Sequence, residues 1–436
     1  MLSIKVPENN IPEREYIIKT LFTDFLGLKY SIFYSNTVKD YIISFKDSEL
    51  TIKDGFFANY RGVLSFLNLN SIPLKVPFTV NEFIKGNDIP IIYGNDELII
   101  SERKIYCGLD VFASSFFMLT RWEEIVNEIR DSHGRFPGSE STAFKNNFLL
   151  RPVVNEYVEM LWEMLKKLGY NGIRKSRKFE VVFTHDIDIL IYNRSIKTIL
   201  GDIFRRKNVH AAFENIKYLF YPNPYNTFDL LMTKSEKLEV KSHFYLMSSS
   251  GNSIYDSNSY LNSKLFRHSV DEIKKRGHIL GFHPGYDTFD NPCKWRDEKD
   301  LLENAIQQKV LEGRQHYLRI DLTKTLSIWE ENNMEIDSTL GYADKEGFRC
   351  GTGDVFHLFD IKGRRILKLK ERPLIVMDGT LRQYQEYPLD KVSDVLNYYI
   401  SIGKKFGSLI TLLFHNSSFY GDWKGYDIVY EKIGIN

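Results

Sequence analysis

A histidine and two aspartates directly follow an apolar stretch in the segment VVFTHDIDIL, residues 181–190. They are His185, Asp186 and Asp188. Residues two apart in an extended chain point to the same side, so we expect Asp186 and Asp188 to share one face. One carboxylate can then bind a metal ion while the other accepts a proton from water, and metal-assisted hydrolysis needs both tasks.

Further ionisable residues follow later apolar stretches. Four such pairs of stretch and residue are HILGF with His283, NMEI with Asp337, LIVM with Asp378 and LITLLF with His415. In parallel sheets and α/β barrels the carboxyl ends of the strands meet at one rim, where active sites lie. We therefore expect these side chains to gather at that rim around a divalent cation.

The elements that must position these residues alternate between apolar strands and helices from residue 178 onward. Strands are expected in FEVVF, SHFYLM, HILGF, HYLRI, RPLIVM and LITLLF, with helices such as SVDEIKKRG and KVSDVLNYYISIGKKFG between them. This alternation is typical of a parallel sheet or barrel. A long insertion at roughly residues 191–235 either covers the site as a lid or packs on the flank of the barrel.

The length of 436 residues exceeds what one hydrophobic core usually serves, so two domains are expected. We assign residues 1–150 to a smaller α+β domain, residues 151–177 to a linking helix and residues 178–436 to an α/β barrel. The linking helix is predicted because apolar residues from Val154 to Leu168 recur every three or four positions and Gly169 follows.

The charge balance favours neither nucleic acid nor an anionic membrane as a partner, because 58 basic residues face 57 acidic ones. No stretch approaches the roughly 18 apolar residues of a membrane span, and the amino-terminal segment is polar where a signal peptide would be apolar. Three widely spaced cysteines are typical of a reducing compartment. We therefore expect a cytoplasmic protein, whose oligomeric state the sequence does not indicate.

Five segments, in order, resemble the motifs of the polysaccharide deacetylases with a NodB homology domain, carbohydrate esterase family 4. The segments are FTHDID, GHILGFH, GRQHYLRI, IDSTLGYADKEGFRCGT and LITLLFHN. The resemblance covers residues 178–436 and implies a distorted (β/α) barrel that removes acetyl groups from N-acetylated sugars. In the amino-terminal part, FFMLTRWEE and RPVVNEYVEMLW look like the uncharacterised domain that precedes some bacterial members.

The resemblance also implies a metal site built around Asp188 and His283. The family's second motif usually has another histidine four residues after the first, and this chain has Asp287 there. We take Asp287 as the first choice for the third ligand, with His316 and His185 as alternatives. Zinc is the first choice for the ion, and exchange of imidazole for carboxylate also suits manganese, cobalt or iron.

The same resemblance implies the catalytic roles. Asp186 would be the general base, oriented by Arg314, and the backbone amide of Tyr317 would help to stabilise the oxyanion. His415 would protonate the departing amine. Asp337 is the first choice as the carboxylate that fixes His415 or Arg314.

Asp378 is the alternative to Asp337 as the carboxylate that fixes His415 or Arg314. The function predicted is metal-dependent removal of an acetyl group from an N-acetylated sugar or glycan precursor. Two other functions stay open. The chain could be a catalytically inactive glycan-binding or scaffold protein on the same barrel, or a hydrolase of another non-peptide C–N amide bond.

Overall fold

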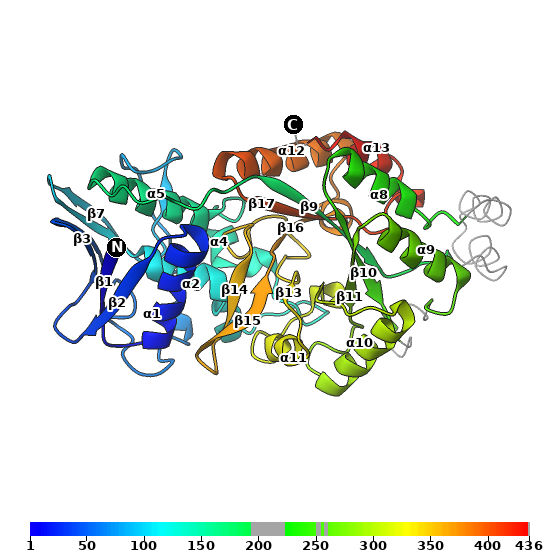
Figure 1. Cartoon of the computed structure of the whole chain (residues 1–436), viewed down its shortest axis with the longest axis horizontal. Helices are drawn as coiled ribbons and strands as arrows, with labels where there is room; N and C mark the ends of the chain where they lie inside the picture. Colours follow the sequence, from blue (N-terminus) through cyan, green and yellow to red (C-terminus); the bar gives the residue numbers. More distant parts are fainter. Residues whose placement is uncertain (193–222, 250–253, 257–259, 435–436) are drawn as a thin grey trace. The chain divides into compact units, whose positions relative to one another are not determined.

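The computed structural model describes residues 1–192, 223–249, 254–256 and 260–434 (Figure 1). The chain divides into two compact units. Unit 1 comprises Met1–Glu180, Tyr317–Ile375 and Tyr399–Ile410. Unit 2 comprises Val181–His316, Val376–Tyr398 and Thr411–Asn436. The first change of unit falls close to the predicted boundary at residue 178, but two later stretches that the prediction placed in the barrel belong to unit 1.

Unit 1 contains a mixed sheet with the strand order β2-β1-β3-β4-β8-β7. Its strands are β1 (Leu2–Pro7), β2 (Tyr30–Ser35), β3 (Tyr41–Phe45), β4 (Ser48–Ile52), β7 (Gly94–Ile100) and β8 (Lys104–Leu109). Two short strands, β5 (Phe78–Thr79) and β6 (Ile89–Pro90), pair with each other. Later in the chain, β15 (Arg365–Glu371) pairs with β13 (Ile336–Asp337) in parallel and with β14 (Phe356–Asp360) antiparallel.

The helices of unit 1 include the one that was predicted before the barrel. They are α1 (Ile11–Ile18), α2 (Val111–Thr120), α3 (Glu123–Val126), α4 (Thr142–Lys145), α5 (Val153–Lys167) and α11 (Thr325–Glu331). The predicted helix is α5, and its apolar positions Val154, Val158, Leu161 and Leu165 are buried. It ends just before Gly169, whose φ of 84° is a left-handed conformation that glycine adopts without strain.

The strands of unit 2 carry the predicted site residues. They are β9 (Glu180–Ile187), β10 (Ser242–Met247), β11 (Ile279–His283) and β12 (Glu312–Gly313), together with β16 (Leu374–Met377) and β17 (Leu409–Leu413), which begin in unit 1 and end in unit 2. Their order is β12-β11-β10-β9-β17-β16. The strands β9 to β12 pair in parallel, as predicted. All residues from Val181 to Ile187 are buried, which is typical of a central parallel strand covered on both faces. The fold is thus mixed α/β with a curled sheet.

The helices of unit 2 are fixed by caps and by packing on the strands. They are α8 (Phe228–Lys237), α9 (Lys264–Lys275), α10 (Pro292–Ile306) and α13 (Tyr426–Lys432), together with α12 (Leu389–Phe406), which begins in unit 2 and ends in unit 1. Ser263 caps α9 by accepting from the Phe266 amide at 3.1 Å. On α10, the buried Trp295 packs edge-on against Phe282 with 5.0 Å between ring centroids, which fixes this helix beside His283.

The ends of β9 and β10 are tied together by one buried hydroxyl. Tyr260 accepts a hydrogen bond from the Met247 amide at 2.7 Å and donates one to the Ile187 carbonyl at 2.6 Å. Both strand ends are therefore satisfied without water, as buried backbone groups require. Because Ile187 lies between Asp186 and Asp188, this bond also restrains the two acids.

The segment HYLRI and the insertion at residues 191–235 differ from the other predicted elements. HYLRI is not a strand, since β12 is followed by a short 3₁₀ turn at His316–Leu318 in which Tyr317 and Leu318 have φ of 59° and 55°. Such left-handed residues cannot continue a strand.

Most of the insertion at 191–235, namely residues 193–222, lies outside the described residues. Across the described ranges, no helix is both long and apolar enough to cross a bilayer.

Gly281 in GHILGFH is required by close packing. A Cβ at this position would lie 2.5 Å from Cδ1 of Tyr245 and 2.6 Å from the Glu312 carbonyl oxygen. We predict that Gly281→Ala lowers the free energy of unfolding by about 1–3 kcal/mol, measured by urea denaturation. Gly379→Ala is the control, because its nearest neighbour would be 3.5 Å away. Equal stability of Gly281→Ala and the parent would contradict this account of the packing.

Candidate functional site

The predicted site residues of unit 2 lie where its strands end. Asp186 and Asp188 are at the end of β9, and His283 is the last residue of β11. Four further residues follow the ends of three strands: Arg314 and His316 come after β12, Asp378 after β16 and His415 after β17. The structure therefore brings together residues far apart in the sequence at one end of this sheet.

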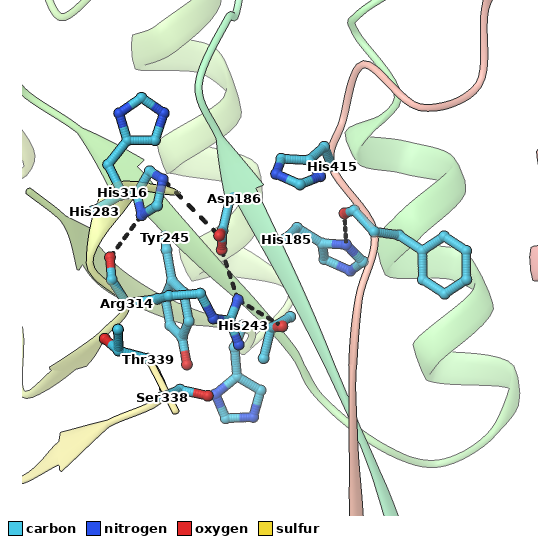
Figure 2. Close-up of polar contacts among 12 residues, drawn as sticks. His185, Asp186, His243, Tyr245, His283, Arg314, His316, Ser338, Thr339 and His415 are labelled. Carbon is cyan, nitrogen blue, oxygen red and sulfur yellow. Dashed lines mark hydrogen bonds and ion pairs between the residues drawn. The ribbon is translucent and has the colours of Figure 1, made fainter. Parts of the chain in front are cut away.

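Asp186 is held by Arg314. The Nη1 atom of Arg314 donates to Oδ1 of Asp186 at 2.7 Å and to the Thr184 hydroxyl at 3.0 Å (Figure 2). The guanidinium group lies over the Tyr245 ring at 5.1 Å. Both side chains of the pair are buried, so this charge-assisted bond fixes the carboxylate in one orientation. Arg314 thus lies where an orienting residue for Asp186 must lie.

His185 points to the opposite side of β9 and belongs to the core. Its Nδ1 donates to the Phe414 carbonyl at 2.8 Å (Figure 2). Its Nε2 accepts from the Ser242 hydroxyl at 3.1 Å. Burial lowers the pKa of His185 to about 3, so the ring is neutral. Both ring nitrogens are engaged, and His185 does not fit the role of a metal ligand that we considered as an alternative.

Asp188, His283 and His316 form a group that could hold a metal ion. Their ligand atoms all lie within 4.8 Å of one another. Nε2 of His283 lies 3.1 Å from Oδ1 of Asp188, and Nε2 of His316 lies 3.7 Å from Oδ2 of the same carboxylate. The two imidazole rings are 4.9 Å apart and tilted by 67°, so each points a nitrogen at Asp188 from a different direction.

The hydrogen bonds of the two histidines show that this donor set fits a cation. Nδ1 of His283 lies 2.6 Å from the Arg314 carbonyl, which can only accept, and Nδ1 of His316 lies 2.9 Å from Oδ1 of Asp256. Both Nδ1 atoms therefore carry the proton of the neutral ring, and both Nε2 lone pairs face the oxygens of Asp188. Only a proton or a cation between them relieves this repulsion. Two imidazoles and one carboxylate are a ligand set for zinc and similar ions and leave open positions.

Protons compete with a cation for this group. Burial disfavours the charged form of His316, but the charges and hydrogen bonds of Asp188 and Asp256 outweigh it and raise the pKa of His316 to about 9. Burial likewise opposes ionisation of Asp188, but His316 and His415 lower the pKa of Asp188 well below its ordinary value. Metal binding must displace the proton of His316, so affinity for a cation should rise with pH up to about that value.

Asp287, our first choice for the third ligand, lies apart from this group. Its side chain is 54% exposed, and its carboxylate lies 3.8 Å from the Lys294 ammonium. Residues four apart share a face only on a helix. Here the chain turns after His283, with Thr288 bonded back to the Gly285 carbonyl, so the geometry replaces Asp287 by His316.

His415 is fixed by Asp378, the alternative in our prediction, and not by Asp337. Nδ1 of His415 lies 2.8 Å from Oδ1 of Asp378, and the His415 amide donates to Oδ2 at 2.7 Å. Nε2 points toward Asp188, 3.7 Å from Oδ2. Asp337 lies on β13 in unit 1, where its carboxylate accepts from the Thr339 amide and hydroxyl.

The charge state of His415 follows from these neighbours. Burial lowers its affinity for a proton, but the carboxylates of Asp378 and Asp188 outweigh burial and raise the pKa of His415 to about 10. The ring is therefore protonated at neutral pH and can donate a proton from Nε2. The pKa of Asp378 is lowered because His415 outweighs the effect of burial.

Two acids near His316 had no signal in the sequence. Asp256 lies between β10 and α9, and its carboxylate is completely buried. Glu298 on α10 accepts from the Gly285 amide at 2.7 Å, and burial, with a smaller effect of the Asp256 charge, raises its pKa to about 7. Tyr317 follows His316 directly, and its carbonyl accepts from Arg135 at 3.1 Å. The oxyanion role of the Tyr317 amide stays a prediction.

Comparison with known proteins gives one family match and several structural neighbours. Residues 2–170 match a family of unknown function, DUF7033. No curated protein matches the chain.

Several solved structures match part of the chain at low sequence identity. A protein from Mycobacterium smegmatis assigned to the polysaccharide deacetylases is 14% identical, with a TM-score of 0.39 over 59% of this chain and 83% of that one. A peptidoglycan N-acetylglucosamine deacetylase is 15% identical, with a TM-score of 0.30 over 59% and 80%. A family 4 pseudoenzyme from Bacillus anthracis is 11% identical, with a TM-score of 0.30 over 63% and 76%. The neighbours thus include both an enzyme and a pseudoenzyme.

Proposed function

We propose that the chain is a metal-dependent hydrolase that removes an acetyl group from an N-acetylated sugar or glycan precursor. One observation supports this above all. A group fit to bind a cation, Asp188 with His283 and His316, lies within 4 Å of both a carboxylate held by arginine and an imidazole held by aspartate. Hydrolysis of an unreactive amide needs a base, an acid and charge stabilisation together.

Each residue has a task in the proposed reaction. A divalent cation bound there would polarise the amide carbonyl and make water more acidic. Asp186 accepts the proton of the attacking water, and Arg314 keeps the carboxylate aimed at it. His415 donates its Nε2 proton to the departing nitrogen. Asp378 stabilises the charged ring of His415 until that transfer.

A site that pairs the base Asp186 with the protonated acid His415 suits an amide substrate better than an ester. An amine is a poor leaving group until its nitrogen is protonated, so an amide hydrolase needs an acid that is still protonated at neutral pH. A pKa of about 10 gives His415 that property. The sugar part of the proposal depends on the five motif segments in family order, within residues 178–436. A cytoplasmic sugar intermediate would suit the few, widely spaced cysteines.

A glycan-binding scaffold without activity is the competing function. It would not require Asp186 and His415 to be held by separate buried partners, Arg314 and Asp378, next to the candidate metal group. Retention of both pairs favours the enzyme.

The metal group generates the first prediction of function. His316→Ala should lower the affinity for Zn²⁺ or Co²⁺ by about 10-fold or more, because it removes a ligand atom. Asp287→Ala is the matched control and should leave the affinity unchanged, since its carboxylate lies outside the group. Competition titration of chelator-treated protein measures both. The reverse order of effects would restore Asp287 as the third ligand.

The reaction itself is tested by acetate release from a panel of N-acetylhexosamines, their nucleotide derivatives and oligosaccharides. We expect release by the protein loaded with Zn²⁺, Mn²⁺ or Co²⁺, loss with a chelator, and a fall of about 100-fold or more in Asp186→Asn, which has no base. Absence of release across metals and substrates would favour the scaffold. Release that survives Asp186→Asn would remove Asp186 from its role.

The pair of His415 and Asp378 generates a prediction about pH. Asp378→Asn removes the largest charge that raises the pKa of His415, so this pKa should fall by about 1–3 units. The protonated acid is then lost at a lower pH, and the alkaline limb of the pH–rate profile should move in the acid direction. NMR titration of the His415 ring measures the pKa directly. An unchanged titration would show that Asp378 does not tune this ring.

A further inference from the structure

The two candidate histidine ligands are anchored by different kinds of acceptor. His283 donates from Nδ1 to the Arg314 carbonyl, a neutral dipole, at 2.6 Å. His316 donates from Nδ1 to the Asp256 carboxylate, a full charge, at 2.9 Å. A carboxylate behind an imidazole fixes its tautomer and its orientation and makes the opposite nitrogen a stronger donor. Asp256 therefore acts on the Nε2 atom of His316, which faces Asp188.

Asp256 is itself held rigidly. Its Oδ2 accepts from the Ser249 hydroxyl at 2.8 Å, and its Oδ1 also accepts from the Tyr286 amide at 2.9 Å. Its side chain has no exposed surface. A carboxylate bound by a backbone amide on a neighbouring segment cannot swing freely, so it holds His316 in one position.

The chain makes room for this acid with a glycine. A Cβ at Gly285 would lie 2.9 Å from Oδ2 of Asp256 and 3.0 Å from the carboxylate of Glu298. Gly285 stands two residues after His283, in the turn that carries the Tyr286 amide. The same turn therefore connects one ligand, through its backbone, to the acid behind the other.

We propose that Asp256 is a positioning residue that sets the strength and direction of His316 as the third metal ligand. This inference rests on the proposed metal-dependent function. Nothing in it requires Asp256 to touch the substrate or the cation. Loss of the Asp256 charge should weaken the binding of a cation by His316, while Asp188 and His283 keep their geometry.

The test compares Co²⁺ binding by chelator-treated parent protein and by Asp256→Asn, which keeps the shape of the side chain and removes its charge. Asp256→Asn should bind Co²⁺ about 10–100-fold more weakly. The visible spectrum of the bound ion should change as well. The control is Glu236→Gln, the same exchange of acid for amide beside His278, which is not in the metal group. It should leave the affinity and the spectrum unchanged.

A second measurement uses the parent protein alone, in case Asp256→Asn does not fold. In the Zn²⁺ form, the Nδ1 proton of His316 should resonate further downfield than that of His283, because a carboxylate accepts it. The two signals are assigned by their loss in His316→Ala and His283→Ala. The opposite order would overturn the inference.

The outcomes separate the two proposals. Tight binding by the parent with equal affinity, within about twofold, and an equal spectrum in Asp256→Asn overturns the role of Asp256 and leaves the proposed function standing. Failure of the parent to bind Zn²⁺, Mn²⁺ or Co²⁺ overturns the metal-dependent function, and the role of Asp256 falls with it.

Discussion

The orientation of three imidazole rings around one carboxylate is the constraint on which the site depends. His283, His316 and His415 each direct Nδ1 at an acceptor behind them, and each directs Nε2 at Asp188, at 3.1, 3.7 and 3.7 Å. The acceptors behind them are the Arg314 carbonyl, Asp256 and Asp378. Because each acceptor binds the Nδ1 proton of its ring, the three Nε2 atoms all point toward Asp188. In the proposed reaction the division between ligand and acid follows from position: the rings of His283 and His316 form the candidate metal group with Asp188, and the ring of His415 donates the proton.

Much of this arrangement could be predicted because ionisable residues that follow strand ends can be recognised in the sequence. Apolar stretches followed at once by Asp186, His283 or His415 identify a rim, since parallel strands end on the same side of their sheet. The two-residue alternation of β9 also separates Asp186 from His185, although the sequence alone could not show that Ser242 and Phe414 occupy both nitrogens of His185.

The remaining features depend on backbone turns and tertiary contacts that no local pattern encodes. The position of Asp287 outside the candidate metal group could not be predicted, because a spacing of four implies a shared face only where the chain is helical, and the residues after His283 form turns. HYLRI reads as a strand by composition, yet two left-handed residues end it. Asp256 is one acid among many in the sequence, and only its burial against His316 distinguishes it.

The position of His316 has a consequence for how such a chain can change over generations. Arg314, which binds Asp186, and His316, of the candidate metal group, are separated by one residue in the segment after β12. A point substitution there would remove only one of them, whereas an insertion or deletion just before Arg314 would displace both at once. A lineage that acquired such a change would lose both proposed roles, proton abstraction and cation binding, in a single event.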